Sequence, residues 1–279
     1  MDASVLKHLP TQEQLDHFNE QGFLIIPNAL DQAQCDHLET LTDAIWAEQK
    51  VQGLGESGNL FYPNFVGRDQ SFIDLLDLPT TFPAVWSIMG WNIYLYHSHL
   101  GVTPQEGQPT DPMKVPLGFH QDSGRVNGDM NEASPRPRVS LKVGYFLSDV
   151  SEEGRGNFHV VPGSHLENNL QKYDDRNPDG AISVCVKRGD AVFFDRRLWH
   201  ARSNNHSPIV RKVLFYGYGY RWIRTKDDTT IRPDLFKNCD PIRRQLLGDG
   251  TNCNGYFSPK DADVPLKVWI EENVEAVPV

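Results

Sequence analysis

The sequence lacks long apolar runs and basic clusters. No stretch of 18 or more apolar residues occurs, so we expect no segment that spans a membrane. No Lys/Arg-rich run occurs either, and 27 basic residues stand against 37 acidic ones, a net charge of −10. An acidic chain without a basic patch is a poor partner for nucleic acid or an anionic membrane surface.

Cysteine is also scarce. The four cysteines lack the CxxC spacing of a zinc or redox site: Cys35, Cys185, Cys239 and Cys253. The apolar surroundings of Cys35 and Cys185 predict buried thiols. Cys239 and Cys253 could pair, but the first residues carry no apolar signal region, which predicts a cytoplasmic protein with free thiols.

The sequence shows no internal repeat, low-complexity run or linker, which predicts one domain over residues 1–279. Its 22 glycines and 19 prolines are spread along the chain and favour a β-rich architecture with many turns. We expect a mainly helical part over residues 1–91, a β core over residues 92–222 and a lid or closing segment over residues 223–279.

Helical signals occur in the first part. Residues 11–21 predict a short helix that Thr11 caps and Gly22 ends, before an apolar strand over residues 23–27. Asp31 and Gln34 have capping-box spacing, and the apolar residues that follow predict an amphipathic helix to about Gln49. Residues 51–69 predict an aromatic loop that either packs on the body or covers a pocket, and two short helices follow over 71–77 and 79–89.

From Asn92 onward the hydrophobic period changes to two, as in strands. The pattern predicts a strand that places Ile93, Leu95, His97 and His99 on one face. It then predicts a half-buried strand over residues 139–147 and further strands over 158–161, 182–186, 191–194, 197–201 and 213–221. Short strands separated by turns indicate a sandwich or barrel. The fold that fits best is a jelly roll (a double-stranded β-helix) with the N-terminal helices on its outer face.

A candidate metal site lies in the β core. His120 and Asp122 are two residues apart, so on an extended chain both side chains project to the same side. His200 offers a second imidazole, and Arg211 follows it by eleven residues. Two histidines and one carboxylate leave metal positions open for oxygen and a co-substrate, as in non-haem Fe(II) oxygenases. His97 and His99 could themselves bind a metal, but no carboxylate lies near them in sequence, which favours polar lining residues.

Four segments resemble, in order, motifs of the phytanoyl-CoA dioxygenase-like (PhyH) family of Fe(II)/2-oxoglutarate oxygenases. They are residues 14–27, residues 119–122, residues 156–165 and the stretch from residue 189 to Arg211. The resemblance implies Fe(II) held by His120, Asp122 and His200, with O₂ and 2-oxoglutarate as co-substrates. It also implies that Arg211 binds the distal carboxylate of 2-oxoglutarate, for which a planar guanidinium is suited.

The loop after His200 departs from the family pattern. A small hydroxyl residue commonly stands two positions after the distal histidine, but here that position is Arg202, and Ser203 follows. Asn205 and Ser207 stand where relatives often have an Asn and a Ser or Thr. We therefore expect Ser203 and Asn205 near the co-substrate, while Arg202 either faces a substrate anion or is solvated. Asp122 argues against a halogenase, because halogenating relatives have Gly or Ala there.

The resemblance implies hydroxylation of an unactivated C–H bond of a small molecule, with 2-oxoglutarate converted to succinate and CO₂. Desaturation, cyclisation, epoxidation and epimerisation start from the same oxidant and stay open. A jelly-roll binding module without turnover is the alternative from another class. No Lys/Arg cluster suited to a CoA diphosphate stands near the expected pocket, and nothing in the sequence indicates an oligomeric state. The candidate pocket walls, of which only one face of the last strand can contribute, are His99, Gln121, Arg125, Tyr216, Tyr218, Trp222 and Arg224.

Overall fold

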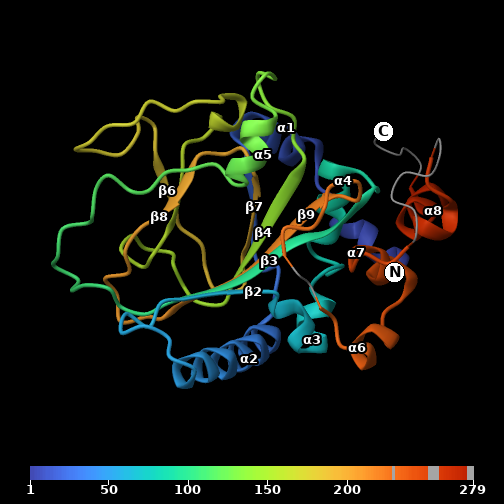
Figure 1. The fold of residues 1–279 in the computed structure, drawn as a ribbon, viewed down its shortest axis with the longest axis horizontal. Helices are drawn as coiled ribbons and strands as arrows, with labels where there is room; N and C mark the ends of the chain where they lie inside the picture. The colour runs from blue at the N-terminus through green and yellow to red at the C-terminus, as the bar shows by residue number, and fades with distance from the viewer. Residues whose placement is uncertain (228–229, 251–257, 275–279) are drawn as a thin grey trace.

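The body of the protein consists of two antiparallel sheets, as a computed structural model shows for residues 1–227, 230–250 and 258–274 (Figure 1). The smaller sheet has the order β6 (Ile182–Val184), β5 (Phe158–Val160), β8 (His200–Arg202). The larger has the order β1 (Phe23–Ile26), β7 (Ala191–Asp195), β4 (Ser140–Phe146), β9 (Arg211–Tyr220), β3 (Ile93–Thr103), β2 (Leu60–Pro63). Their facing sides share a core in which Phe158 and Val184 meet Phe194 and Phe215. This is the predicted jelly roll.

Helices cover the outer face of the larger sheet, as predicted. In Figure 1 α2 (Gln32–Val51) and α3 (Gln70–Asp74) lie below the central strands, and α4 (Phe82–Met89) lies beside them. The C-terminal helices lie toward the right of the same view: α6 (Pro233–Lys237) below, and α7 (Pro241–Leu246) and α8 (Pro265–Asn273) beyond the end of the sheet. The largest apolar cluster, which runs from Phe18 to Ile270, fills the space between helices and sheet.

The two predicted caps are confirmed, whereas the helices predicted over residues 71–77 and 79–89 are shorter, at Gln70–Asp74 and Phe82–Met89. Thr11 and Gln14 form a capping box before α1 (Gln12–Gln21), and Asp31 and Gln34 form one before α2. The predicted loop over residues 51–69 was wrong in part, because it contains β2 and the 3-10 turn η2 (Phe65–Arg68). Phe65 in this segment is fully buried, whereas Phe61 is 63% exposed and lines a cavity. Both alternatives for the segment therefore occur, at different residues.

A β-bulge in β3 changes which side chains share a face. The pairing of β3 with β9 shifts between Leu95 and His97, so one extra residue, Tyr96, stands between them. Ile93 and Leu95 lie in the helix-side core, whereas His97 and His99 line a cavity on the opposite side. The prediction of one common face for these four residues was wrong, because strict alternation ends at the bulge.

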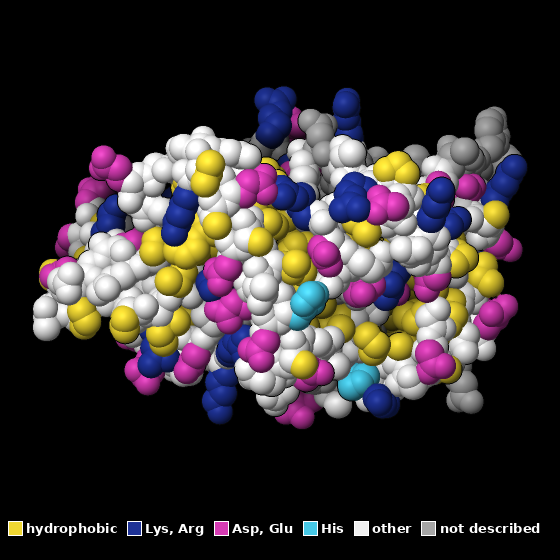
Figure 2. Space-filling view, turned by 90° about the horizontal axis from the view of Figure 1, so that it is seen from below, with side chains coloured by type: hydrophobic (Ala, Val, Ile, Leu, Met, Phe, Trp, Pro, Cys, Tyr) yellow, Lys and Arg dark blue, Asp and Glu magenta, His cyan; other side chains and the backbone are white. Residues whose placement is uncertain are grey.

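The thiols differ from expectation at one position. Cys35 and Cys239 are buried and Cys185 is exposed, and all three are free. The prediction of a buried Cys185 was therefore wrong, while Cys253 lies outside the described residues. Across the described part of the chain no helix is long and apolar enough to cross a membrane. On the face seen in Figure 2, acidic and basic side chains are interspersed and no continuous basic surface gathers.

Candidate active site

His120 and His200 are brought together by the backbone. The two residues form an antiparallel bridge, in which the amide of each donates to the carbonyl of the other at 2.9 and 3.0 Å. Their ring centroids are 4.5 Å apart. His200 begins β8, so this edge of the smaller sheet fixes the loop that carries His120.

The loop around Asp122 is anchored by the segment that follows β7. The amide of Asp122 donates to the carbonyl of Arg196 at 2.9 Å, and its carbonyl accepts from the side chain of Asn127 at 3.0 Å. Arg196, which is almost fully buried, donates in turn to Asn127, a residue of the short helix α5 (Gly124–Asp129). Asp122 therefore has a fixed backbone although it lies in a loop.

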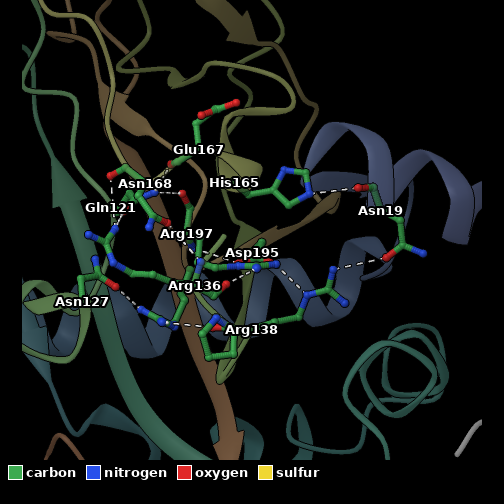
Figure 3. A network of polar contacts seen from close by, with 12 residues as sticks. Asn19, Gln121, Asn127, Arg136, Arg138, His165, Glu167, Asn168, Asp195 and Arg197 are labelled. Atoms are coloured by element: carbon green, nitrogen blue, oxygen red, sulfur yellow. Dashed lines mark hydrogen bonds and ion pairs between the residues drawn. The ribbon is translucent and has the colours of Figure 1, made fainter. Parts of the chain in front are cut away.

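Gln121, between the two candidate ligands, points into a polar network rather than into open space (Figure 3). Its amide donates to the carbonyls of Arg197 at 2.6 Å and Glu167 at 3.1 Å, and its oxygen accepts from Arg136 at 3.1 Å. Buried Asp195 pairs with Arg197 at 2.6 Å in the same network. Gln121 touches the cavity described below, but its hydrogen bonds make it an anchor of the loop.

The three side chains converge as a metal site requires. One ligand atom from each of His120, Asp122 and His200 lies within 4.8 Å of the others. Nδ1 of His120 contacts the carbonyl of Gly118 at 2.9 Å, and Nδ1 of His200 contacts that of Leu198 at 2.8 Å. A carbonyl only accepts, so each Nδ1 carries the proton and each Nε2 is free to bind a metal.

A lysine that the sequence reading placed on an ordinary strand lies at this site. Nζ of Lys142, on β4, is 2.9 Å from Oδ2 of Asp122. Burial by itself raises the pKa of Asp122, but Lys142 and the two imidazoles outweigh burial and hold that pKa far below its usual value. Burial lowers the pKa of His200 to about 4. A carboxylate and a neutral imidazole are the protonation states that metal binding needs.

A cavity of about 670 Å³ begins at the three candidate ligands and extends to Arg211 at the start of β9. Arg211 is 4% exposed, and its Nε has no hydrogen-bond partner among the described residues. Burial, with Arg202 nearby, lowers the pKa of Arg211 to about 9. A buried guanidinium without a carboxylate partner is a site that an anion would stabilise.

Gly156 makes room for this guanidinium. It has φ +70°, and a Cβ on it would lie 2.8 Å from Cδ of Arg211. Any larger residue here would therefore strain the backbone and displace the arginine side chain.

The loop after β8 is organised differently from the expectation. Asn205 is fully buried, and its amide donates to the carbonyls of Thr103 and Ile209 at 3.0 and 2.7 Å. It holds the loop that leads to Arg211 and does not line the cavity, so its predicted contact with the co-substrate is not supported. Ser203 lines a separate cavity and does not line this one either.

Arg202 is exposed to solvent and also lines the cavity, so the structure is compatible with both predicted alternatives. It forms a two-pronged ion pair with Glu106 at 2.6 and 3.0 Å at the cavity wall. Whether a basic cluster suited to a CoA diphosphate stands near the pocket stays a prediction, because two of the basic residues there are paired with carboxylates. The basic residues that line the cavity are Lys142, Arg202, Arg211 and Lys226.

Several nominated pocket walls lie elsewhere. Tyr216 and Tyr218 are buried on the helix side of β9, where their hydroxyls donate to the carbonyls of Phe72 and Leu76, each at 2.8 Å. Their nomination was wrong because the residues of β9 that line the cavity are Arg211 and Phe215. The remaining three are outside the cavity: Trp222 stacks on Tyr220 and is 52% exposed, Arg224 is exposed, and Arg125 pairs with Asp129 in solvent.

His99 does line the cavity, as nominated, and His97 lies beside it. His97 is in turn paired with Asp227, which lies 130 positions later in the sequence. No sequence spacing connects Asp227 with His97, so sequence reasoning missed this pair, as it missed Lys142.

A jelly roll that carries two histidines and one carboxylate beside a cavity defines the class of non-haem metal oxygenases. The sequence profile of the phytanoyl-CoA dioxygenase (PhyH) family matches residues 18–213, so the chain belongs to this family. The protein is accordingly a 2-oxoglutarate-dependent dioxygenase.

Two curated relatives agree with the family. The chain is 24% identical to the dioxygenase af480 of Aspergillus fumigatus, over 83% of this chain and 74% of that protein. It is also 24% identical to the peroxisomal phytanoyl-CoA dioxygenase of Bos taurus, over 72% of this chain and 66% of that protein. The chain thus spans about two thirds to three quarters of these relatives.

Solved structures share the fold. HygX from Streptomyces hygroscopicus, with nickel and 2-oxoglutarate bound, superimposes with a TM-score of 0.61 at 17% identity, covering 81% of this chain and 94% of that one. The non-haem α-ketoglutarate-dependent carbocyclase SnoK from nogalamycin biosynthesis superimposes with a TM-score of 0.58 at 20% identity, covering 76% and 85%.

Proposed function

We propose that the protein oxidises, by hydroxylation, an unactivated C–H bond of a small molecule and converts 2-oxoglutarate to succinate and CO₂. His120, Asp122 and His200 would hold Fe(II), and Arg211 would bind the distal carboxylate of 2-oxoglutarate. Bound iron supplies the activation of O₂ that this chemistry needs. The observation that carries the proposal is the convergence of three ligand atoms within 4.8 Å on a cavity that also contains Arg211.

The donor set fits iron on chemical grounds. Two imidazoles and one carboxylate leave positions open for a 2-oxoacid and for oxygen, which a site with four protein ligands would not. Lys142 would hold the second oxygen of Asp122, so that the carboxylate offers one oxygen to the metal. The Phe194 and Phe215 rings on the cavity wall would exclude water around the co-substrate.

Arg211 would bind a carboxylate of the co-substrate. Its guanidinium is buried and unpaired at Nε, and one carboxylate of a bound dicarboxylic acid would supply its missing partner. Arg202, which is already paired with Glu106, is a weaker candidate for the same role.

The proposal treats residues 1–279 as one domain, because the main core cluster joins residues from Phe18 to Ile270. Within it residues 1–91 would be the helical cover, 92–222 the jelly-roll core and 223–279 the closing segment. Small molecules are the expected partners, since the cavity holds about 670 Å³. A cytoplasmic location and the absence of nucleic-acid partners stay predictions.

Spectroscopy tests the site directly. Anaerobic addition of Fe(II) and 2-oxoglutarate to the purified protein should give a weak metal-to-ligand absorption band in the visible. The variant Asp122→Ala should lose this band, whereas Arg224→Ala, at an exposed residue outside the cavity, should keep it. A wild-type protein that shows no band and forms no succinate would be a binding module instead.

Product mass distinguishes the possible outcomes once a substrate is found. Hydroxylation adds one oxygen atom, whereas desaturation or ring closure removes two hydrogens. The similarity to the carbocyclase SnoK keeps ring closure as the second candidate.

A further inference from the structure

Three polar side chains that the proposed iron site does not use form a hydrogen-bonded chain into the cavity. Oδ2 of Asp227 lies 2.8 Å from Nδ1 of His97, and Nε2 of His97 lies 3.0 Å from Nδ1 of His99. The same oxygen of Asp227 accepts from the amide of Ser98 at 2.7 Å. Asp227 is thereby held in place by β3, and His99 is the end of the chain that lines the cavity.

The contacts determine where the protons are. A carboxylate only accepts, so Nδ1 of His97 carries a proton. If the ring of His97 is neutral, its Nε2 has a lone pair and accepts the proton that Nδ1 of His99 donates. Nε2 of His99 is then unprotonated, and it is the polar atom that His99 offers to the cavity.

The surroundings favour neutral rings. Burial, above all other causes, lowers the pKa of both histidines, and Lys142 lowers both further. Lys226 on the loop beside Asp227 acts in the same direction, while Asp227 raises the pKa of His97 without reversing the shift. A charged His97 would instead donate from both nitrogens and turn Nε2 of His99 into a donor.

The ring of His99 has a fixed orientation as well. It is stacked between Phe61 of β2 and Phe215 of β9, with centroid distances of 4.5 and 4.6 Å and interplanar angles of 23° and 21°. Stacking on both faces leaves only the ring edge for polar contacts. One nitrogen on that edge is engaged with His97, and the other remains for a ligand.

The cavity reaches this edge, because His97 and His99 line it together with Lys142. Gly217 of β9 stands between Lys142 of β4 and His97 of β3 in the cross-strand row, and a Cβ on it would lie 3.0 Å from the carbonyl oxygen of His97, so a larger residue would displace His97. A molecule bound in the cavity would meet Lys142, the partner of Asp122, and the histidine pair.

We propose that Asp227 and His97 are positioning residues that fix the tautomer of His99, so that Nε2 of His99 accepts a hydrogen bond from a hydroxyl group of the substrate. This substrate class, an alcohol or phenol, rests on the proposed function. A hydroxyl is preferred to an ammonium group as the donor, because Lys142 and Lys226 also line the cavity and would repel a cation.

Nitrogen NMR tests the tautomer without turnover. The full-length protein is labelled with ¹⁵N-histidine, loaded with Zn(II) and 2-oxoglutarate, and the two rings are assigned with His97→Gln and His99→Gln. We expect Nδ1–H on both rings and an unprotonated Nε2 on His99. A proton on Nε2 of His99, or a doubly protonated His97, would overturn the proposal.

Two variants of Asp227 separate positioning from structure. Asp227→Ala removes the acceptor, so His97 should move its proton to Nε2 and force His99 into the Nε2–H tautomer. Asp227→Asn keeps an oxygen that can accept from His97, and it should restore the wild-type tautomers. If the alanine variant keeps Nδ1–H on His99, Asp227 has a structural role only. Arg224→Ala, on the same segment, is the matched control.

The ligand class is tested with phenol and cyclohexanol, each compared with its methyl ether. Both alcohols should shift the Nε2 resonance of His99 in the wild type more than their ethers do, whereas in Asp227→Ala, where Nε2 carries a proton and donates, alcohol and ether should act alike. The ethers should bind about tenfold more weakly, because they cannot donate. Equal shifts with alcohols and ethers, or no shift with any of them, would contradict the acceptor role.

These results are separable from the iron proposal. If the iron–2-oxoglutarate band appears but the tautomers differ from expectation, only the inference about His99 fails. If the band is absent while the tautomers are as expected, the proposed oxygenase function fails and the histidine arrangement stands.

Discussion

Nζ of Lys142 lies 2.9 Å from Oδ2 of Asp122, so a lysine in the middle of β4 neutralises the one carboxylate among the candidate metal ligands. Both side chains are about nine-tenths buried. Without a metal, the ammonium group is the main compensation for the buried negative charge. With a metal on the other oxygen, it would keep Oδ2 from becoming a second ligand.

Lys142→Met should therefore leave the buried carboxylate of Asp122 without a positively charged partner in the metal-free protein. We expect a loss of about 3 kcal/mol in the free energy of unfolding. Mn(II) should restore much of that loss, because the metal replaces the missing positive charge, while turnover should fall about 10- to 100-fold. Urea unfolding with and without Mn(II) measures the first effect.

Lys212→Met is the matched control. Lys212 is similarly buried on β9, but it pairs with Glu39 and Asp43 of α2 on the outer face. Its loss should destabilise the protein in a way that Mn(II) does not reverse. Equal recovery of both variants with metal would contradict the role given to Lys142.

Arg211→Met should separate stability from co-substrate binding. The guanidinium is buried without a partner at Nε, so replacing it by an apolar side chain of similar length should leave the free protein equally stable or more stable. We expect 2-oxoglutarate to raise the melting temperature of the wild type, and the same change should abolish that rise. Thermal unfolding with and without 2-oxoglutarate measures both effects, and an unchanged rise in the variant would assign the carboxylate to another residue.

Local signals predicted the scaffold well. The capping pairs Thr11–Gln14 and Asp31–Gln34 fixed the starts of α1 and α2 because they act within one helical turn. Strand periodicity gave the jelly roll, but it gave the wrong face for His97 because a single extra residue in β3 inverts the alternation. Strand periodicity also predicted that one face of β4 is exposed. In the structure both faces of β4 are buried, one against helices and the other against the second sheet.

The proposed iron site was predictable in outline, since His120, Asp122 and His200 were chosen from spacing and resemblance and do converge. Its surroundings were not. From the alternation of the strand alone, Lys142 is expected to face solvent. In the fold the second sheet covers it. Asp227 reaches His97 from a loop with no regular structure, and such a contact leaves no periodic trace in the sequence.

Tyr216→Phe tests the corrected position of the β9 tyrosines. Its hydroxyl donates to the carbonyl of Phe72 in the helix-side core, so the change leaves a buried acceptor unpaired. We expect a loss of about 1–2 kcal/mol of stability and no change in the formation of succinate. Denaturant unfolding and a succinate assay are the measurements. A loss of activity without a loss of stability would contradict this position and indicate that Tyr216 lines the pocket.

Asp195→Asn should weaken the loop that carries Asp122, and its effect should depend on pH. Asp195 is fully buried and pairs with Arg197 at 2.6 Å and Arg138 at 2.7 Å (Figure 3). Burial alone raises the pKa of its carboxyl group, but the two guanidinium groups outweigh burial and lower that pKa below its usual value. The stabilisation is therefore complete above the unfolded pKa of about 4 and is lost as the pH falls through the lower folded value.

At pH 7 the asparagine variant should be less stable than the wild type by about 3 kcal/mol, since one partner of a buried ion pair is removed. The difference should begin to shrink below about pH 4, where the carboxylate becomes protonated in the unfolded chain, and should shrink further as the pH falls through the lower folded value. Urea unfolding of both proteins between pH 3 and 7 measures this convergence. Because Arg197 also holds Gln121 through its carbonyl, the variant should bind Fe(II) more weakly at neutral pH as well. A difference in stability that is constant over the whole range would mean that the carboxylate of Asp195 contributes through packing rather than through its charge.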